Sequence, residues 1–473
     1  LIASAQSTIN IGGAISSTSS MSLNSPVILK DNTSLTTTNS QITIGDTVNS
    51  ESSETNDLTV STGSSEIQFD GVVGGVSTLG AISITGKLDL NAAIGNGATA
   101  GATSINVSGT TNLGANVTTS ATQTYQDTLT LDSGTSLTLD AGISEDSDIN
   151  LAAVTGVSGG AAENLTLDAG SNADAAIAVT GTVTDITTLT IRDAGSVTFG
   201  DDVTLATKID LQATTGTITF NGALTTLDID TDTADIYNIA LNAGGTITNA
   251  TTFANTGTLT IGNAAGDSMT FTGGIIAIAP SSINLAGTVA TTNTTMTLGD
   301  GDTGITLTKA TTLSAVSGAI NVNGAVTGGD NALTINTTGT GTLAATISGL
   351  TTLETNANGT TAISANISSS STQTYNDAVT VNGTLDLTGS TVQFASTLQG
   401  DGTEDDLTIS GNLDLDGAAS SLTTLTVEGD SNIAANVTTS STQTYGNDAA
   451  NDTTTVNGTL DLTGSTVQFA STL

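Results

Sequence analysis

The sequence TVNGTLDLTGSTVQFASTL occurs twice in this chain without a single change, at Thr380–Leu398 and at Thr455–Leu473. Within it, the segments LDL and TVQF alternate apolar and polar residues, which is typical of short β-strands with one buried face. Gly, which favours turns, precedes each of these segments. A block that is copied whole along a chain is typical of stacked repeats and not of a globular domain.

A second block precedes each copy. ANISSSSTQTY at Ala365–Tyr375 matches ANVTTSSTQTY at Ala435–Tyr445 and also ANVTTSATQTY at Ala115–Tyr125. Residues 365 and 435 are 70 apart, whereas residues 380 and 455 are 75 apart, so five residues are inserted between the blocks. We expect this insertion, within Gly446–Thr455, to be an exposed loop, because repeat proteins absorb length changes between stacked units. We expect the 70-residue offset to be three turns of about 23 residues.

Short alternating runs also fill the middle of the chain, and each should place its two apolar residues on one face. The runs are LTI at 189–191, VTF at 197–199, VTL at 203–205, IDL at 209–211, ITF at 218–220 and LDI at 227–229. Every third run is separated by about 20–24 residues, a repeat length expected of solenoids. The sequence therefore predicts an all-β fold, a parallel β-helix (β-solenoid) with about three short strands per turn and about 20 turns.

We expect residues 1–473 to form one continuous solenoid, with a near-exact internal duplication in residues 365–473. Its core should be made of inward-facing aliphatic and aromatic residues from the strands. In the duplicated block these residues are Leu385, Leu387, Val392 and Phe394, with their copies Leu460, Leu462, Val467 and Phe469. The Tyr of each TQTY segment, at 125, 375 and 445, should cover a corner of the coil.

The composition agrees with a narrow β core. Among 473 residues, aromatics are 2%, Trp, His and Cys are absent, Gly occurs 54 times and Pro twice. Pro is disfavoured where each strand must donate hydrogen bonds to its neighbours. Disorder is the alternative for such a polar chain, but disordered segments are low in hydrophobicity and rich in Pro. The mean hydropathy of +0.15 argues against it.

The charge restricts the partners. Five basic residues stand against 44 acidic ones, which gives a net charge of −39. Nucleic acids and anionic membrane surfaces need Lys and Arg clusters, so the sequence excludes the first and disfavours the second. No apolar run reaches the 18 or so residues that indicate a transmembrane helix. The partner that this charge favours is a cation, above all Ca²⁺, although no cofactor is required.

Two acidic clusters are candidate calcium sites. GDGDTGITL at Gly299–Leu307 partly matches the Gly/Asp motif of calcium-binding β-rolls, with Asp300 and Asp302 as ligands. In the second cluster, Asp228 and Asp230 alternate along a predicted strand and face one side, and Asp232 and Asp235 follow. Two further acidic clusters are Glu145–Asp146–Asp148 and Asp401–Glu404–Asp405–Asp406. The alternative for all of them is a solvated face that keeps the protein soluble.

Catalysis has little support in the sequence. Without His and Cys, most general-base and nucleophile arrangements cannot be built, and no catalytic residues are predicted. The enzyme alternative is a β-helix polysaccharide lyase, which would use acidic residues, Ca²⁺ and a basic residue. Only Arg192 and Lys208 approach that basic role, and their acidic neighbours predict surface ion pairs instead.

The phrases ANVTTSSTQTY and TVNGTLDLTGSTVQFASTL resemble the repeats of large exported bacterial proteins of the filamentous-haemagglutinin and autotransporter-passenger kind. The general kind of repeat is similar along the whole chain, and the resemblance is close in residues 115–131 and 365–473. It implies a right-handed parallel β-helix that is secreted to the cell surface as an adhesin or fibre.

The sequence is compatible with three functions. The first is a non-catalytic, rod-like structural protein of an extracellular fibre, sheath or surface layer. The second is a surface adhesin that presents loops to a host or a glycan, and the third is the polysaccharide lyase. The chain starts at Leu1 and ends flush with a repeat at Leu473, which suggests a processed chain or a fragment. We expect self-association through its terminal turns, because unpaired strand edges invite strand addition.

Overall fold

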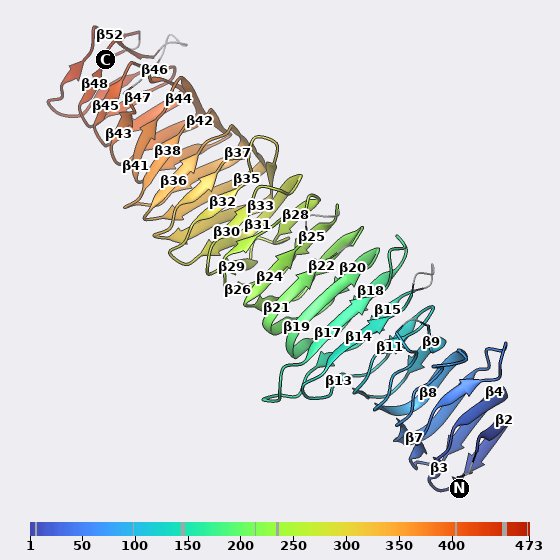
Figure 1. Ribbon diagram of the computed structural model, residues 1–473. Coiled ribbons are helices and arrows are strands. Elements are labelled where there is room, and N and C mark those ends of the chain that lie inside the picture. The colour runs from blue at the N-terminus through green and yellow to red at the C-terminus, as the bar shows by residue number, and fades with distance from the viewer. Residues whose placement is uncertain are drawn as a thin grey trace. The chain divides into compact units, whose positions relative to one another are not determined.

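The structure is a computed structural model. It describes residues 1–4, 7–97, 99–142, 147–212, 214–232, 236–402, 404–446, 452–470 and 472–473. Across these residues the chain consists of strands and turns, without an α-helix. It divides into two compact units, Leu1–Ile239 and Ala240–Leu473. In Figure 1 the strands of each unit lie side by side in chain order, blue to green in the first unit and green through yellow to red in the second.

The first turns of unit 1 show how the coil is built. Strand β2 (Ile9–Ser17) pairs in parallel with β4 (Val27–Thr37) over two stretches, with a shift in register between them. Strand β3 (Met21–Leu23) then pairs in parallel with β5 (Ile42–Ile44). One bent strand and one short strand therefore supply three β segments per turn, as the sequence predicted.

Unit 2 repeats this plan with a separate sheet for the short strands. Long bent strands such as β33 (Gly304–Val316) and β35 (Val326–Thr337) pair in two stretches with a register shift between them. The short strands form an eleven-stranded sheet. Its members are β27 (Thr251–Thr252), β30 (Ile275–Ala277), β32 (Met296–Leu298), β34 (Ile320–Val322), β36 (Thr340–Leu343), β38 (Thr360–Ile363), β41 (Ala378–Val381), β43 (Leu398–Gly400), β45 (Ala419–Leu422), β48 (Val437–Thr439) and β51 (Leu462–Thr463).

The strands are parallel and make about 21 turns in all, so the predicted parallel β-solenoid is confirmed. Its core consists of the inward residues of every strand, and these alternate with outward ones. Leu385, Leu387, Val392 and Phe394 are 0–4% exposed, as predicted. Their copies at 460, 462, 467 and 469 alternate in the same sense but are only half-buried.

One of the six predicted runs was assigned wrongly. Ile229 is buried, but Leu227 is 40% exposed and does not share its face. Thr226 points inward instead, 2% exposed, and its hydroxyl donates to the carbonyls of Thr207 and Asp228. A hydroxyl that bonds the backbone can replace an aliphatic side chain at a corner, so simple alternation fails there.

The prediction that the 70-residue offset between the two copies is three whole turns is also wrong. Ile367 pairs with Leu387 in the larger sheet, whereas its counterpart Val437 lies on β48 in the eleven-stranded sheet. The chain of paired residues runs from Ile367 through 387, 409 and 427 to Tyr445, which is four turns of 20, 22, 18 and 18 residues. Because these turns are shorter than about 23 residues, an offset of 70 residues does not complete a whole number of them. The two copies therefore lie on different faces of the coil.

The register of this core can be tested at Leu387, which is fully buried beside the exposed Thr388 on the same strand, β42 (Leu385–Phe394). Leu387→Asp should lower the free energy of unfolding by more than about 3 kcal/mol, since an unpaired carboxylate would enter an apolar column. Thr388→Asp adds the same charge and should change it by less than about 1 kcal/mol. Thermal unfolding followed by circular dichroism measures both, and equal destabilisation would refute the register.

Candidate functional site

The predicted calcium cluster that contains Asp228 and Asp230 includes an ion pair with Lys208. Asp228 and Asp230 lie on β24 (Asp228–Thr231), in register with Lys208 and Asp210 of the preceding turn. The Lys208 ammonium contacts the carboxylate of Asp230 at 3.0 Å and that of Asp210 at 3.7 Å. The hydrogen bond to Asp230 is the main reason that the pKa of Lys208 is raised. The ammonium of Lys208 therefore already lies between the carboxylates of Asp210 and Asp230.

The predicted cluster within Gly299–Leu307 closes its own turn. Asp300 and Asp302 follow β32, and one carboxylate oxygen of Asp300 accepts the N–H groups of Asp302 and Thr303, each at 2.9 Å. These two bonds, that from Asp302 first, lower the pKa of Asp300. The hydroxyl of Thr303 is buried and donates to the carbonyls of Ile278 and Pro280. The turn is therefore held by local bonds, and Asp302 is exposed beside it.

Across the described residues, no group of three or more acidic side chains is placed so that it could hold a metal ion. The two predicted clusters lie in different units, Asp228, Asp230 and Asp232 in unit 1 and the pair after β32 in unit 2. Glu145, Asp146 and Asp235 lie outside the described residues, as do residues 447–451 of the inserted loop. Calcium binding by Asp228, Asp230, Asp232, Asp300 and Asp302 stays a prediction.

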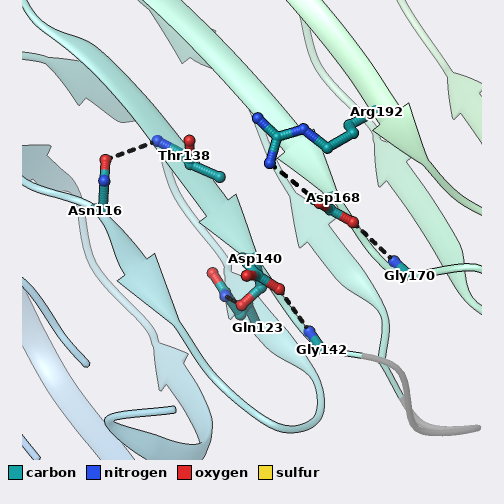
Figure 2. A network of polar contacts seen from close by, with 8 residues as sticks. All are labelled: Asn116, Gln123, Thr138, Asp140, Gly142, Asp168, Gly170 and Arg192. Carbon is teal, nitrogen blue, oxygen red and sulfur yellow. Dashed lines mark hydrogen bonds and ion pairs between the residues drawn. The ribbon is translucent and has the colours of Figure 1, made fainter. Parts of the chain in front are cut away.

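A third acidic group, which was not predicted, forms a column on the outside of unit 1. Asp140 and Asp168 pair in register on β14 (Ser136–Asp140) and β17 (Asn164–Asp168), and Asp193 follows in the next turn. Figure 2 shows the first two, each accepting a hydrogen bond from the Gly two residues later, at 2.9 and 3.1 Å. The sequence signal is the phrase LTLDAG at residues 137–142 and 165–170, with DAG again at 193–195.

Arg192 joins this column through an insertion. The pairing register shifts after Leu167, so that Asp168 pairs with Asp193 and Arg192 is the extra residue. Its guanidinium reaches Asp168 at 3.4 Å, as Figure 2 shows. Burial, followed by the charge of Asp140, raises the pKa of Asp168, and Arg192 opposes this shift only in part. The ion pairs expected for Arg192 and Lys208 are both present.

The interior of the coil contains a polar cluster at each TQTY segment. Gln123, Gln373 and Gln443 are 0% exposed, and the following Tyr donates its hydroxyl to the Gln side-chain oxygen in all three, at 3.3, 2.9 and 3.0 Å. The prediction that these Tyr cover corners is wrong, because all three rings are buried. The ring of Tyr375 stacks on Phe394 of the next turn, with centroids 5.2 Å apart.

The amide of each buried Gln is satisfied as well. Gln373 donates to the carbonyl of Ile367 in its own turn at 3.1 Å and to that of Thr388 in the next turn at 2.8 Å. Gln443 donates in the same way to Val437 and Thr463. The copies lie on different faces, so the local sequence determines the cluster, whichever face it occupies. Alternation alone could not predict it, because Gln is a residue expected outside.

A double-mutant cycle can measure the coupling within one cluster. Tyr375→Phe should lower the free energy of unfolding by about 1–2 kcal/mol, because it leaves a buried amide oxygen without a donor. Gln373→Leu should cost about 2 kcal/mol or more, since it leaves buried carbonyls and the Tyr hydroxyl unpaired. The double variant should lose less than the sum of the two when unfolding is followed in urea. Additive losses would show that the two side chains are not coupled.

One buried carboxylate, that of Asp377, is held by hydroxyl groups. Asp377 is 4% exposed and lies between β40 (Thr372–Tyr375) and β41. The hydroxyl of Thr355 donates to it at 2.7 Å and that of Thr361 at 2.9 Å. Burial raises the pKa of Asp377, and these two hydroxyls offset the shift only in part.

A raised pKa means that the folded state binds this proton more tightly than the unfolded state. The contribution of Asp377 to stability is therefore fully present below its ordinary pKa of 3.8 and is lost as the pH rises through the raised value. Asp377→Asn should raise the melting temperature at neutral pH, and the gain should vanish on acidification below that value. Asp302→Asn, at an exposed position, removes the same charge and should give a smaller gain. A loss of stability in Asp377→Asn at neutral pH would contradict this account.

No protein-family model, no curated protein and no solved structure matches this chain. In the part of the chain that the structure describes, there is no helix long and apolar enough to cross a membrane. The candidate sites therefore rest on the geometry of the chain alone.

Proposed function

We propose that this protein is a non-catalytic structural component of an extracellular fibre, sheath or surface layer, in which the stacked β coil is the building material. One observation carries the proposal: outward polar side chains bond to the next turn of the stack. Asn112 donates to Asp89 at 3.0 Å, and Asn432 donates to Asp414 at 2.8 Å. The hydroxyls of Thr340 and Thr360 lie 3.1 Å apart.

Such ladders use polar groups to join neighbouring turns, as the buried Gln and Tyr side chains do inside. Residues 115–131 and 365–473 carry the resemblance to exported bacterial repeat proteins, and this supports a place at the cell surface. Against a lyase, the guanidinium of Arg192 and the ammonium of Lys208 are each engaged by carboxylates of neighbouring turns. Against a glycan adhesin, the four Tyr rings are fully buried, and sugar-binding surfaces commonly need exposed aromatic rings.

Electron microscopy of the negatively stained, purified chain tests this proposal. We expect filaments or sheets that grow with protein concentration, retain the circular dichroism of the dissolved chain and disperse on dilution. Millimolar calcium should promote them, since cations moderate repulsion between chains of charge −39. Single particles at every concentration, with and without calcium, would contradict the structural role.

The same preparation also tests the enzyme alternative. Incubation with acidic polysaccharides should produce no unsaturated sugar ends, which are detected by their ultraviolet absorbance. A steady rise in that absorbance, abolished by Arg192→Ala and unaffected by Thr388→Asp, would replace the structural proposal with a lyase.

A further inference from the structure

The eleven-stranded sheet of unit 2 has an outer face without charge. None of its eleven strands contains Asp, Glu, Lys or Arg. The outward residues at the centre of these strands form what is here termed the neutral face. From β27 to β51 they are Thr252, Ile276, Thr297, Asn321, Thr342, Ala362, Thr380, Gln399, Ser420, Thr438 and Thr463.

The other outward columns of unit 2 are different. The long strands that complete each turn carry Glu354 on β37 (Ile347–Thr355), Asp386 on β42, and Asp406 and Asp414 on β44 (Asp406–Leu415). Lys309 is the only basic residue in the sequence from 240 to 473. Two copies of this chain that approach through these columns repel each other, whereas the neutral face brings no like charges together.

The neutral face is also partly apolar. Ile276 is 43% exposed on it, and a shallow hollow of about 380 Å³ lies beside Ile276. Gly273 and Gly274 line that hollow, so no side chain fills it. None of the eleven strands contains an aromatic residue, which disfavours a sugar as the occupant because stacking rings are missing. Small hydroxyl, amide and methyl groups suit close packing of one sheet against another.

The size of the face is sufficient for a specific but weak contact. Eleven strands about 4.8 Å apart make it about 50 Å long, and three residues per strand make it about 10 Å wide. A pair of such faces buries about 1,000 Å², the lower limit of a specific protein interface. A single contact of this kind is reversible, and it becomes strong when many are made in one assembly.

We propose that the neutral face packs against the neutral face of a second copy of this chain. The two faces are related by a two-fold axis, so the same residues meet from both sides and the acidic columns of both copies point away from the contact. The inference rests on the proposed structural function and adds to it a lateral contact, separate from any contact between terminal turns. Outward Thr and Asn groups that bond along the stack are held in place for such packing, which lowers the entropy lost on association.

Single cysteines test the contact, because the chain has no Cys of its own. Ala362→Cys lies on β38, the sixth of the eleven strands, where a centred two-fold axis brings the two thiols together. Thr342→Cys and Thr380→Cys cover an offset along the stack. The control is Thr327→Cys, which is exposed on β35 and outside the neutral face. A dimer holds thiols at millimolar effective concentration, so mild oxidation of the micromolar chain should link at least one of the three about 100-fold faster than the control.

A charge variant provides the second readout. Thr342→Asp with Thr380→Asp should abolish the cross-linking of Ala362→Cys and shift the full chain to monomers in sedimentation velocity. Thr306→Asp with Thr327→Asp adds the same charge outside the neutral face and should leave both unchanged. Circular dichroism confirms that each variant remains folded. The proposal fails if the three neutral-face cysteines link no faster than Thr327→Cys, or if both charge variants act alike.

These outcomes separate the inference from the proposed function. Filaments or sheets in the electron microscope without cross-linking through the neutral face would overturn the lateral contact and leave the structural role standing. Absence of both assembly and cross-linking would overturn both. A monomeric chain that binds insoluble polysaccharide, and loses that binding on Thr342→Asp with Thr380→Asp, would assign the face to a glycan and also count against the proposal.

Discussion

The structure depends on one constraint: the backbone of each turn forms its hydrogen bonds with the turns before and after it, in parallel register. The two Pro residues show how strictly this holds, because Pro26 lies directly before β4 and Pro280 lies two residues before β31 (Ser282–Thr291). Neither interrupts a strand, where a missing N–H would break the ladder. Turn length varies, for example from 18 residues between Ile9 and Val27 to 29 between Val154 and Val183, and the corners absorb the difference.

Parallel register turns each strand position into a column, and each column has its own chemistry. Inside, aliphatic side chains stack, and the Gln and Tyr of each TQTY segment join two turns by fully satisfied polar bonds. Outside, hydroxyl and amide groups bond along the stack, and carboxylates sit beside amides or one of the few cations. Acidic residues stack directly in two places, where Asp140, Asp168 and Asp193 follow one another and where Asp230 lies on Asp210. Burial, and after it the charge of Asp140, raises the pKa of Asp168, and the inserted Arg192 partly offsets this shift.

The fold could be predicted from the sequence because the alternation that indicates strands is local and recurs along the chain. Alternation placed Leu387 and Phe394 in the core correctly, and the repeat length predicted the number of turns. It misplaced Leu227 and the TQTY tyrosines because a buried Thr or Gln that bonds the backbone cannot be distinguished from an outward one by polarity. Which face each copy of the duplicated block occupies depends on the length of each turn. That length varies between 18 and 22 residues in this region and cannot be derived from the repeated sequence.

The candidate sites were harder to predict for a related reason. Acidic residues close in sequence, such as Asp300 and Asp302, need not converge, since one can close its own turn. Acidic residues far apart in the sequence, such as Asp140 and Asp168, can be predicted to meet only when the pairing register of their strands is known. The repeated phrase LTLDAG was the available signal for that column, and it identifies a turn that stacks on its own copy.

The central claim, parallel stacking in this register, is tested most directly by distances between spin labels on the eleven-stranded sheet. Labels at Thr297 and Thr380 are four strands apart, and labels at Thr297 and Thr438 are seven strands apart. With about 4.8 Å per strand, electron dipolar spectroscopy on labelled chain diluted with unlabelled chain should give about 19 Å and about 34 Å between backbone positions. Distances that do not increase in the ratio of four to seven would contradict the parallel coil.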